Sequence, residues 1–152
     1  MRSPTLRTWL FIILVVSLIG TTAELFMLDH RETFTQWIPY GVFGVGILAT
    51  GAVAIRPNVW TLNLLRGAML LFVATGVLGL YFHYRGNVEF ELEMKPALKG
   101  WGLLKEALSG ATPTLAPGAM SQIGLLGLLF TYRHPALTAR KDETRQQSEI
   151  LV

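Results

Sequence analysis

The chain has 152 residues, of which 51% are hydrophobic and only 15% are charged. A water-soluble protein of this size needs a wider polar coat, and an independent soluble domain of about 50 residues has no room beside the apolar stretches. The lack of cysteine excludes disulfide bonds, thiolate metal sites and dithiol exchange in this chain. The net charge of +3 is spread among the apolar stretches and not gathered into one basic stripe, which argues against nucleic-acid binding.

Four apolar stretches predict membrane-spanning helices at 6–28, 37–55, 61–84 and about 115–132. Each comes close to the roughly 20 apolar residues that cross a hydrocarbon core about 30 Å thick. We therefore expect an all-α fold, a membrane four-helix bundle in one domain over residues 1–135. A polar tail, 136–152, follows it.

The charges beside these stretches predict their orientation. Basic residues precede the first span, bracket the loop between the second and third, and follow the fourth, namely Arg2, Arg7, Arg56, Arg66, Arg133, Arg140, Lys141 and Arg145. Because cytoplasmic loops carry an excess of Lys and Arg, both termini are expected in the cytoplasm.

The first span has a second interpretation as a secretory signal peptide. Arg2 and Arg7 precede an apolar run, and the small residues Thr21 and Ala23 would allow cleavage before Glu24. However, the apolar run resumes at 25–28 and reaches full spanning length, which favours a retained helix.

Small residues recur every four positions within two of the spans. The second span has Gly46, Thr50 and Ala54, and the third has Thr75 and Gly79. Such faces let helix backbones approach closely where lipid removes the hydrophobic incentive to associate. They predict packing inside the bundle, with a homodimer contact as the alternative.

The outer segment, residues 86–117, divides into three parts. From Val88 to Met94 apolar residues alternate with glutamates, a period of two that suggests an extended segment with its carboxylates on one side. Pro96 then opens a pattern of an amphipathic helix ending near Gly110, whose Trp101 would anchor it in the outer headgroup region. A proline-rich return leads into the last span.

Polar residues gather at the outer ends of the first and third spans: Glu24, Asp29, His30, Arg31, Glu32, His83 and Arg85. One interpretation is an interfacial ion-pair network of Glu24, Arg31 and Arg85 with hydrogen-bonding histidines. A second is a divalent-metal site. Its candidate ligands are His30, His83, Asp29, Glu32 and one of Glu89, Glu91 and Glu93. A third is an anion or headgroup pocket formed by Arg31, Arg85 and the histidines.

Catalysis and transport have little support in the sequence. No nucleophile elbow or glycine-rich phosphate loop is present, so we expect no enzyme and no cofactor. A proton relay through Glu24 is the alternative, but the inner halves of the spans offer few polar residues for a path across the bilayer.

Three stretches, AELFMLDHRETFTQWIPYGVFGVGIL, GLYFHYRGNVEFELEM and TYRHPAL, resemble those of small four-span bacterial membrane proteins of no known activity. The resemblance implies a multi-pass protein of the bacterial inner membrane. By elimination, the sequence favours an accessory or assembly subunit whose partners are the lipid bilayer and other membrane-protein subunits. The alternative is a stand-alone protein that binds a metal, lipid headgroup or small anion at the outward polar cluster.

Overall fold

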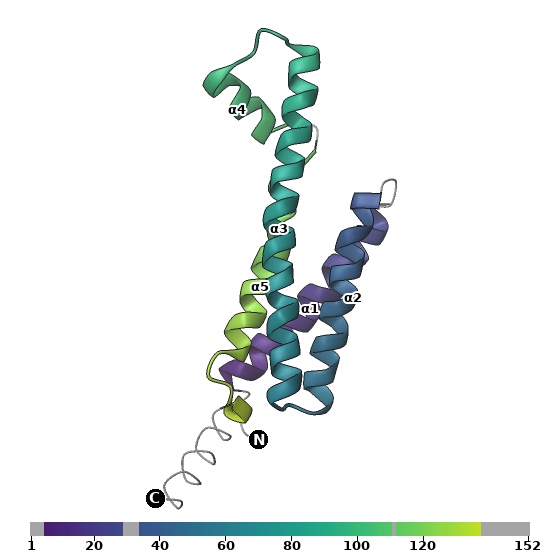
Figure 1. Ribbon diagram of the computed structural model, residues 1–152, viewed down its shortest axis with the longest axis vertical. Helices are drawn as coiled ribbons and strands as arrows, with labels where there is room; N and C mark the ends of the chain where they lie inside the picture. Colours follow the sequence, from purple (N-terminus) through teal and green to yellow (C-terminus); the bar gives the residue numbers. More distant parts are fainter. Residues whose placement is uncertain (1–4, 29–33, 111, 138–152) are drawn as a thin grey trace, which may run out of the picture.

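The computed structural model describes residues 5–28, 34–110 and 112–137. These residues form five helices and no strand: α1 (Leu6–Met27), α2 (Phe34–Ile55), α3 (Val59–Met94), α4 (Gly100–Leu108) and α5 (Gly118–Thr131) (Figure 1). The expected all-α class is therefore confirmed for this part of the chain.

Three of the helices are long and apolar enough to cross a membrane. They are α1 and α2, with 22 residues each, and α3, with 36. The fourth predicted span is helical only from Gly118 to Thr131, and its 14 residues rise about 21 Å, less than a hydrocarbon core about 30 Å thick. A turn over Pro113–Pro117 takes the place of the first residues of that predicted span.

The third helix is the axis of the molecule. It packs against α5, α2 and α4, while α1 packs against α5 and α2, so that α1, α2, α3 and α5 lie together over the lower half of Figure 1. The C-terminal part of α3 extends beyond this bundle and carries α4 beside it. At 36 residues, α3 rises about 54 Å, far more than one membrane crossing requires.

A reciprocal cap defines where α3 begins. The side chain of Asn58 accepts hydrogen bonds from the backbone N–H groups of Trp60 (2.8 Å) and Thr61 (3.1 Å), and the Thr61 hydroxyl accepts from the Asn58 N–H (3.1 Å). These bonds satisfy N–H groups that have no partner within the helix. The short connection from α2 to α3 is thus held in place, and the two helices run antiparallel.

The core of the bundle lies where α1, α2, α3 and α5 meet. Its fully buried side chains include Leu14, Leu18, Phe43, Leu65, Met69 and Phe72. The rings of Phe43 and Phe72 meet edge to face with centroids 4.9 Å apart, an arrangement that aromatic pairs favour.

The expectation of an extended segment at 88–94 is wrong, because α3 continues through Met94. In a helix the alternation no longer puts all three glutamates on one side. Glu89 and Glu93, four residues apart, share a face and are exposed, whereas Glu91 is 8% exposed and turns toward Lys95. Hydrogen bonding along the helix and packing against α4 outweigh the period-two pattern.

Candidate functional site

Part of the predicted polar cluster, Asp29, His30, Arg31 and Glu32, lies outside the described residues. Of the remaining members, Glu24 is exposed on the last turns of α1. Arg85 forms an ion pair with Glu89, one turn along its own helix, with Nε 2.8 Å from Oε1. This neighbouring carboxylate raises the pKa of the Arg85 guanidinium above its ordinary value.

His83 lies beside the return that leads into α5. Its Nδ1 is 3.1 Å from the carbonyl oxygen of Pro113, and because a carbonyl only accepts, the imidazole donates from Nδ1. Within the described ranges, no three histidine or acidic side chains come together in a way that would hold a metal ion. Glu89, a candidate metal ligand, is engaged with Arg85.

The predicted small-residue faces differ in where they point. Gly46 and Thr50 are buried, and the Gly46 backbone lies against the ring of Phe72, which a Cβ there would approach to 2.5 Å. Ala54 is exposed, because a four-residue repeat drifts by about 40° per step around a helix with 3.6 residues per turn. Thr75 is partly exposed, while Gly79 faces the ring of Pro117.

The closest helix contact is the seam between α3 and α5. A Cβ at Gly124 would lie 2.6 Å from the Met69 carbonyl oxygen, so the two backbones touch. Gly127 faces the Met69 side chain, and Ser121 donates a hydrogen bond of 3.1 Å to the Val73 carbonyl oxygen. The sequence signal for this seam is the pair of glycines on α5, which lacks a four-residue repeat.

Beyond the bundle, α4 folds against the end of α3 and forms what we call the head, residues 85–109. Asn87, 2% exposed, connects the head to the return, the segment 112–117 that leads into α5. Its side-chain amide donates to the carbonyl oxygens of Ala107 (2.9 Å) and Thr112 (2.8 Å), and its Oδ1 accepts from the Thr112 hydroxyl (2.7 Å). At the far end of the head, Lys95 Nζ lies 3.5 Å from Glu91 Oε2 and 3.6 Å from Glu106 Oε2.

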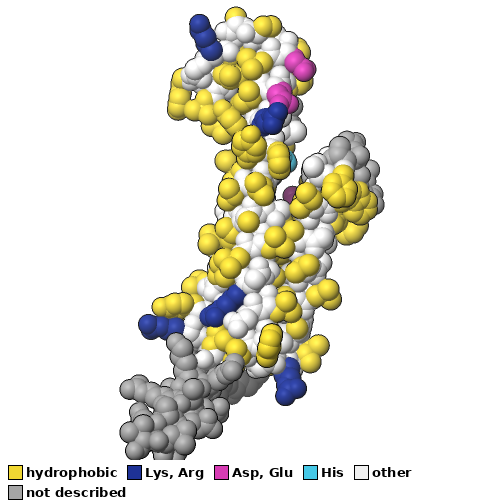
Figure 2. Space-filling model, viewed as in Figure 1, with side chains coloured by type: hydrophobic (Ala, Val, Ile, Leu, Met, Phe, Trp, Pro, Cys, Tyr) yellow, Lys and Arg dark blue, Asp and Glu magenta, His cyan; other side chains and the backbone are white. Residues whose placement is uncertain are grey.

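The head exposes large apolar side chains. They are Phe90, Met94, Trp101 and Leu108, with exposed fractions from 47% for Phe90 and Leu108 to 79% for Trp101. Figure 2 shows hydrophobic side chains gathered over this part of the molecule beside a few charged ones. Because α3 and α4 contact each other, this apolar surface belongs to one folded unit.

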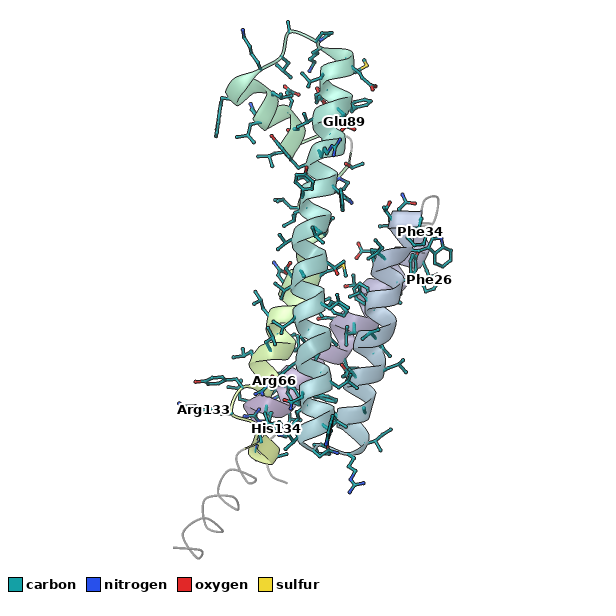
Figure 3. The ribbon with its side chains drawn as sticks, in the orientation of Figure 1. Phe26, Phe34, Arg66, Glu89, Arg133 and His134 are labelled. Atoms are coloured by element: carbon teal, nitrogen blue, oxygen red, sulfur yellow. The ribbon has the colours of Figure 1, made fainter. Side chains whose placement is uncertain are left out.

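At the opposite end of the molecule, two arginines hold the last turn of α5. Arg7 of α1 donates to the carbonyl oxygens of Phe130, Tyr132 and Arg133, and Arg66 of α3 donates to Thr131 through its carbonyl (3.1 Å) and hydroxyl (3.2 Å). The carbonyls at a helix C-terminus have no partner within the helix and carry partial negative charge. Figure 3 shows Arg66, Arg133 and His134 at this end and Glu89 far from them.

His134 follows α5 and begins a new helical turn. Its Nδ1 accepts a hydrogen bond from the Ala136 N–H (3.2 Å), and its ring lies 5.5 Å from that of Phe130. Burial, together with the positive charges of Arg7 and Arg66, lowers the pKa of His134 below 6.5. This lowering favours the neutral imidazole, the form in which Nδ1 accepts from Ala136.

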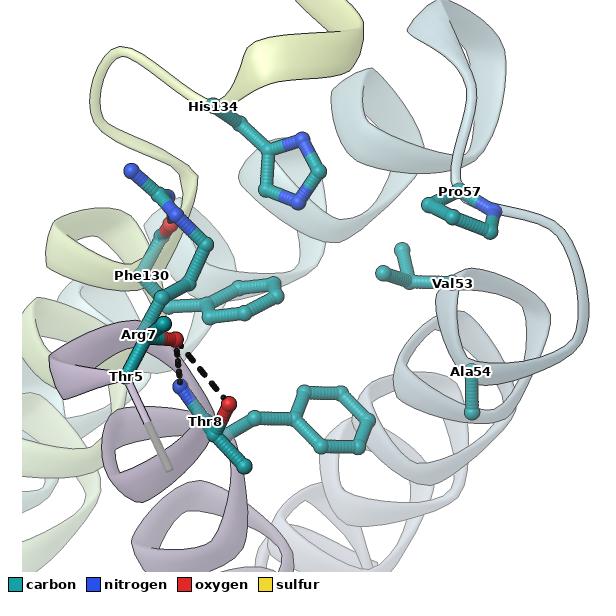
Figure 4. Close-up of a pocket in the computed structure, with 9 residues that line it drawn as sticks. Thr5, Arg7, Thr8, Val53, Ala54, Pro57, Phe130 and His134 are labelled. Atoms are coloured by element: carbon teal, nitrogen blue, oxygen red, sulfur yellow. Dashed lines mark hydrogen bonds between the residues drawn. The ribbon is translucent and has the colours of Figure 1, made fainter. Parts of the chain in front are cut away.

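A hollow of about 280 Å³ opens beside these groups. Thr5, Arg7 and Thr8 border it from the start of α1, and Val53, Ala54 and Pro57 border it from the end of α2 (Figure 4). The rings of Phe11, Phe130 and His134 complete its wall. No pattern along the sequence points to this hollow, because its lining residues come from the start of α1, the end of α2 and the end of α5.

Comparison with protein-family models, with curated proteins and with solved structures finds no match for this chain.

Proposed function

We propose that this protein is a non-enzymatic accessory or assembly subunit of a larger membrane complex. The observation that carries the proposal is the head, which exposes Phe90, Met94, Trp101 and Leu108. Large apolar surface outside a hydrocarbon core is unusual unless another molecule covers it. The head lies on the part of α3 that follows Arg85, beyond its apolar, charge-free stretch.

The packing of the head suits a contact surface. Asn87 and Lys95 tie α4 and the return to α3 through hydrogen bonds and ion pairs. A surface that is already ordered loses little conformational entropy when a partner binds. The polar side chains of Asn87 and Lys95 thus stabilise the fold of the head, which supports a role in binding a partner over a role in catalysis.

The proposed setting is a bacterial inner membrane, with both termini in the cytoplasm and the head outside. The distribution of charge supports this orientation. Arg7, Arg56, Arg66 and Arg133 lie at one end, where the described residues include no acid. At the other end the basic residues Arg85, Lys95, Lys99 and Lys105 are balanced by Glu24, Glu89, Glu91, Glu93 and Glu106. In this proposal α5, although shorter than one membrane crossing, is the fourth helix of the membrane bundle, and α4 lies near the outer interface.

Native mass spectrometry of the protein extracted gently from its own membrane tests the proposal. We expect a particle that contains other polypeptides in a constant stoichiometry. Trp101→Ser should release them, because it removes the most exposed large apolar side chain of the head. The matched control is Trp60→Ser at the other end of α3, where the side chain is 84% exposed.

A bare monomer or homodimer in the wild-type preparation would overturn the proposal. So would an equal effect of the two tryptophan substitutions, since the head would then have no special part in assembly.

The alternative function is a stand-alone binding protein that holds a metal, lipid headgroup or small anion at the outward polar cluster. Its specific support is Glu24, an exposed carboxylate near the end of α1, whose other charged residue is Arg7 at its start. Intramembrane ionisable groups are costly and are commonly functional. If native mass spectrometry shows a bound metal, lipid or anion that is lost after His83→Ala while the helical content is unchanged, this alternative is favoured.

A further inference from the structure

We propose that the hollow bordered by the start of α1, the end of α2 and the end of α5 is a binding site for one anionic phospholipid. The inference concerns the end of the molecule opposite the head, and it does not depend on the accessory function. It rests on the shape and lining of the hollow and on the charge around it.

The lining has the two-part chemistry of a lipid site. Phe11, Val53 and Phe130 supply an apolar wall, and Thr5, Arg7 and Thr8 supply polar groups at its border. Thr5, Thr8 and Ala54 are exposed, so the hollow opens at the surface of the bundle. Because α1 and α2 are apolar, spanning-length helices, an opening on their outer surface faces the boundary between lipid tails and headgroups.

The charge around the hollow favours an anion. Arg7 lines it, and Arg56 precedes the lining residue Pro57 in the chain. Arg133, which precedes the lining residue His134, has its guanidinium over the ring of Tyr132. In the described part of the chain, no acidic side chain lies at this end, and the hydrogen-bond acceptors of Arg7 and Arg66 are neutral carbonyls and a hydroxyl. No described carboxylate therefore offsets the positive charge of Arg7 and Arg66.

Shape and charge together select the occupant. Basic pockets between spanning helices at the cytoplasmic side suit lipid phosphate groups. The terminal nitrogens of Arg7 already donate to carbonyls of α5, so this arginine attracts a phosphate through its positive charge. A free phosphate ion would leave the apolar wall exposed, and a zwitterionic lipid would leave the positive charge unbalanced. A phospholipid of net negative charge satisfies both, with its phosphate beside Arg7 and the first part of an acyl chain against Phe11 and Val53.

The first test is native mass spectrometry of the full chain in mild detergent with added phosphatidylglycerol or phosphatidylcholine. The wild-type protein should retain one phosphatidylglycerol under conditions that remove phosphatidylcholine. Ala54→Leu should lower this retention roughly tenfold, because the added atoms fill the hollow without changing any charge. Ala74→Leu, the same change at an exposed position on α3, should have no effect.

Three outcomes would overturn the assignment. Equal retention of the two lipids would show that charge does not select the occupant, and displacement of the lipid by inorganic phosphate would identify a free anion as the ligand. A wild-type dimer that Ala54→Leu converts to a monomer would assign the hollow to a second copy of the chain.

A measurement on the unaltered protein makes the test independent of how the variants fold. Phosphatidylglycerol with a photoreactive group near the start of an acyl chain should label peptides that contain Phe11 or Val53. Labelling spread evenly over the exposed faces of α1, α2 and α3 would contradict a single site.

Discussion

At the scale of single residues, the structure depends on a few polar side chains that replace missing backbone partners. Asn87 bonds to Ala107 and Thr112, while Arg7 and Arg66 bond to the end of α5. Each lies in or beside a helix that is otherwise apolar, and each joins segments far apart in the sequence. Loss of such a group removes hydrogen bonds that each contribute about 0.5–1.5 kcal/mol to stability.

Asn87→Leu tests the connection at the head. The substitution keeps the approximate size of the side chain but removes its donors and its acceptor, so α4 and the return should separate from α3 more readily. We expect the head to lose about 2–4 kcal/mol of local stability, measured by hydrogen exchange of the α4 amides. Asn63→Leu, an exposed position on the same helix, should leave that exchange unchanged. Unaltered protection of α4 in the Asn87 variant would contradict the role given to this residue.

His134 predicts a dependence of stability on pH. Its pKa in the folded protein is lowered, so the unfolded chain binds more protons as the pH falls through 6.5. Protonation would also remove the acceptor of the Ala136 N–H and place a cation beside Arg7 and Arg66. The folded state should therefore lose stability as the pH falls below 6.5 and show no contribution from this group well above it.

Thermal unfolding in detergent at about pH 7.5 and pH 5 measures the effect. His134→Asn retains an acceptor and does not titrate, so it should reduce the difference in Tm between the two conditions. His83→Asn is the matched control and should preserve most of it. If the two variants keep the same pH dependence as the wild type, His134 does not contribute to it.

At the scale of elements, the contact between α3 and α5 depends on glycine. Gly124→Ala would place a methyl group 2.6 Å from the Met69 carbonyl oxygen and 3.0 Å from the Val73 nitrogen, both of which belong to the backbone of α3. The helices would have to separate, which we expect to cost about 1–3 kcal/mol.

Gly67→Ala is the matched control, because nothing lies within 4 Å of its added Cβ. Alanine favours a helix over glycine by up to about 1 kcal/mol, so this variant should be slightly more stable than the wild type. Unfolding in a denaturing detergent measures both free energies. The same sign of change at the two positions would contradict a close α3–α5 seam.

At the scale of the whole molecule, a long α3 connects two ends of different character. One is the head, which exposes large apolar side chains beside charged ones, and the other is an arginine-rich end with a hollow (Figures 2 and 3). The proposed orientation is testable because the chain has no cysteine. With Ser109→Cys, a membrane-impermeant maleimide should label intact spheroplasts, and with Trp60→Cys it should label only after lysis. The opposite pattern would reverse the orientation.

Much of the architecture follows from local sequence properties. Apolar runs of spanning length predict the three long helices, because hydrocarbon requires every backbone polar group to be satisfied within the segment. Of the candidate polar cluster, the sequence identifies charged residues at the helix ends but not their partners. Arg85, for example, pairs with Glu89 on its own helix, since residues four apart are neighbours there.

The sequence by itself determined the helical class, the apolar spans and the group of basic residues without nearby acids at one end, because these depend on composition and on spacing along one segment. Only the tertiary structure decided that α3 continues to Met94, that Asn87 holds the return, and that Arg7 and Arg66 meet at α5. These features join residues more than 20 positions apart or depend on packing against α4. A periodic pattern within one segment contains no information about such partners, which appear only when the helices are assembled.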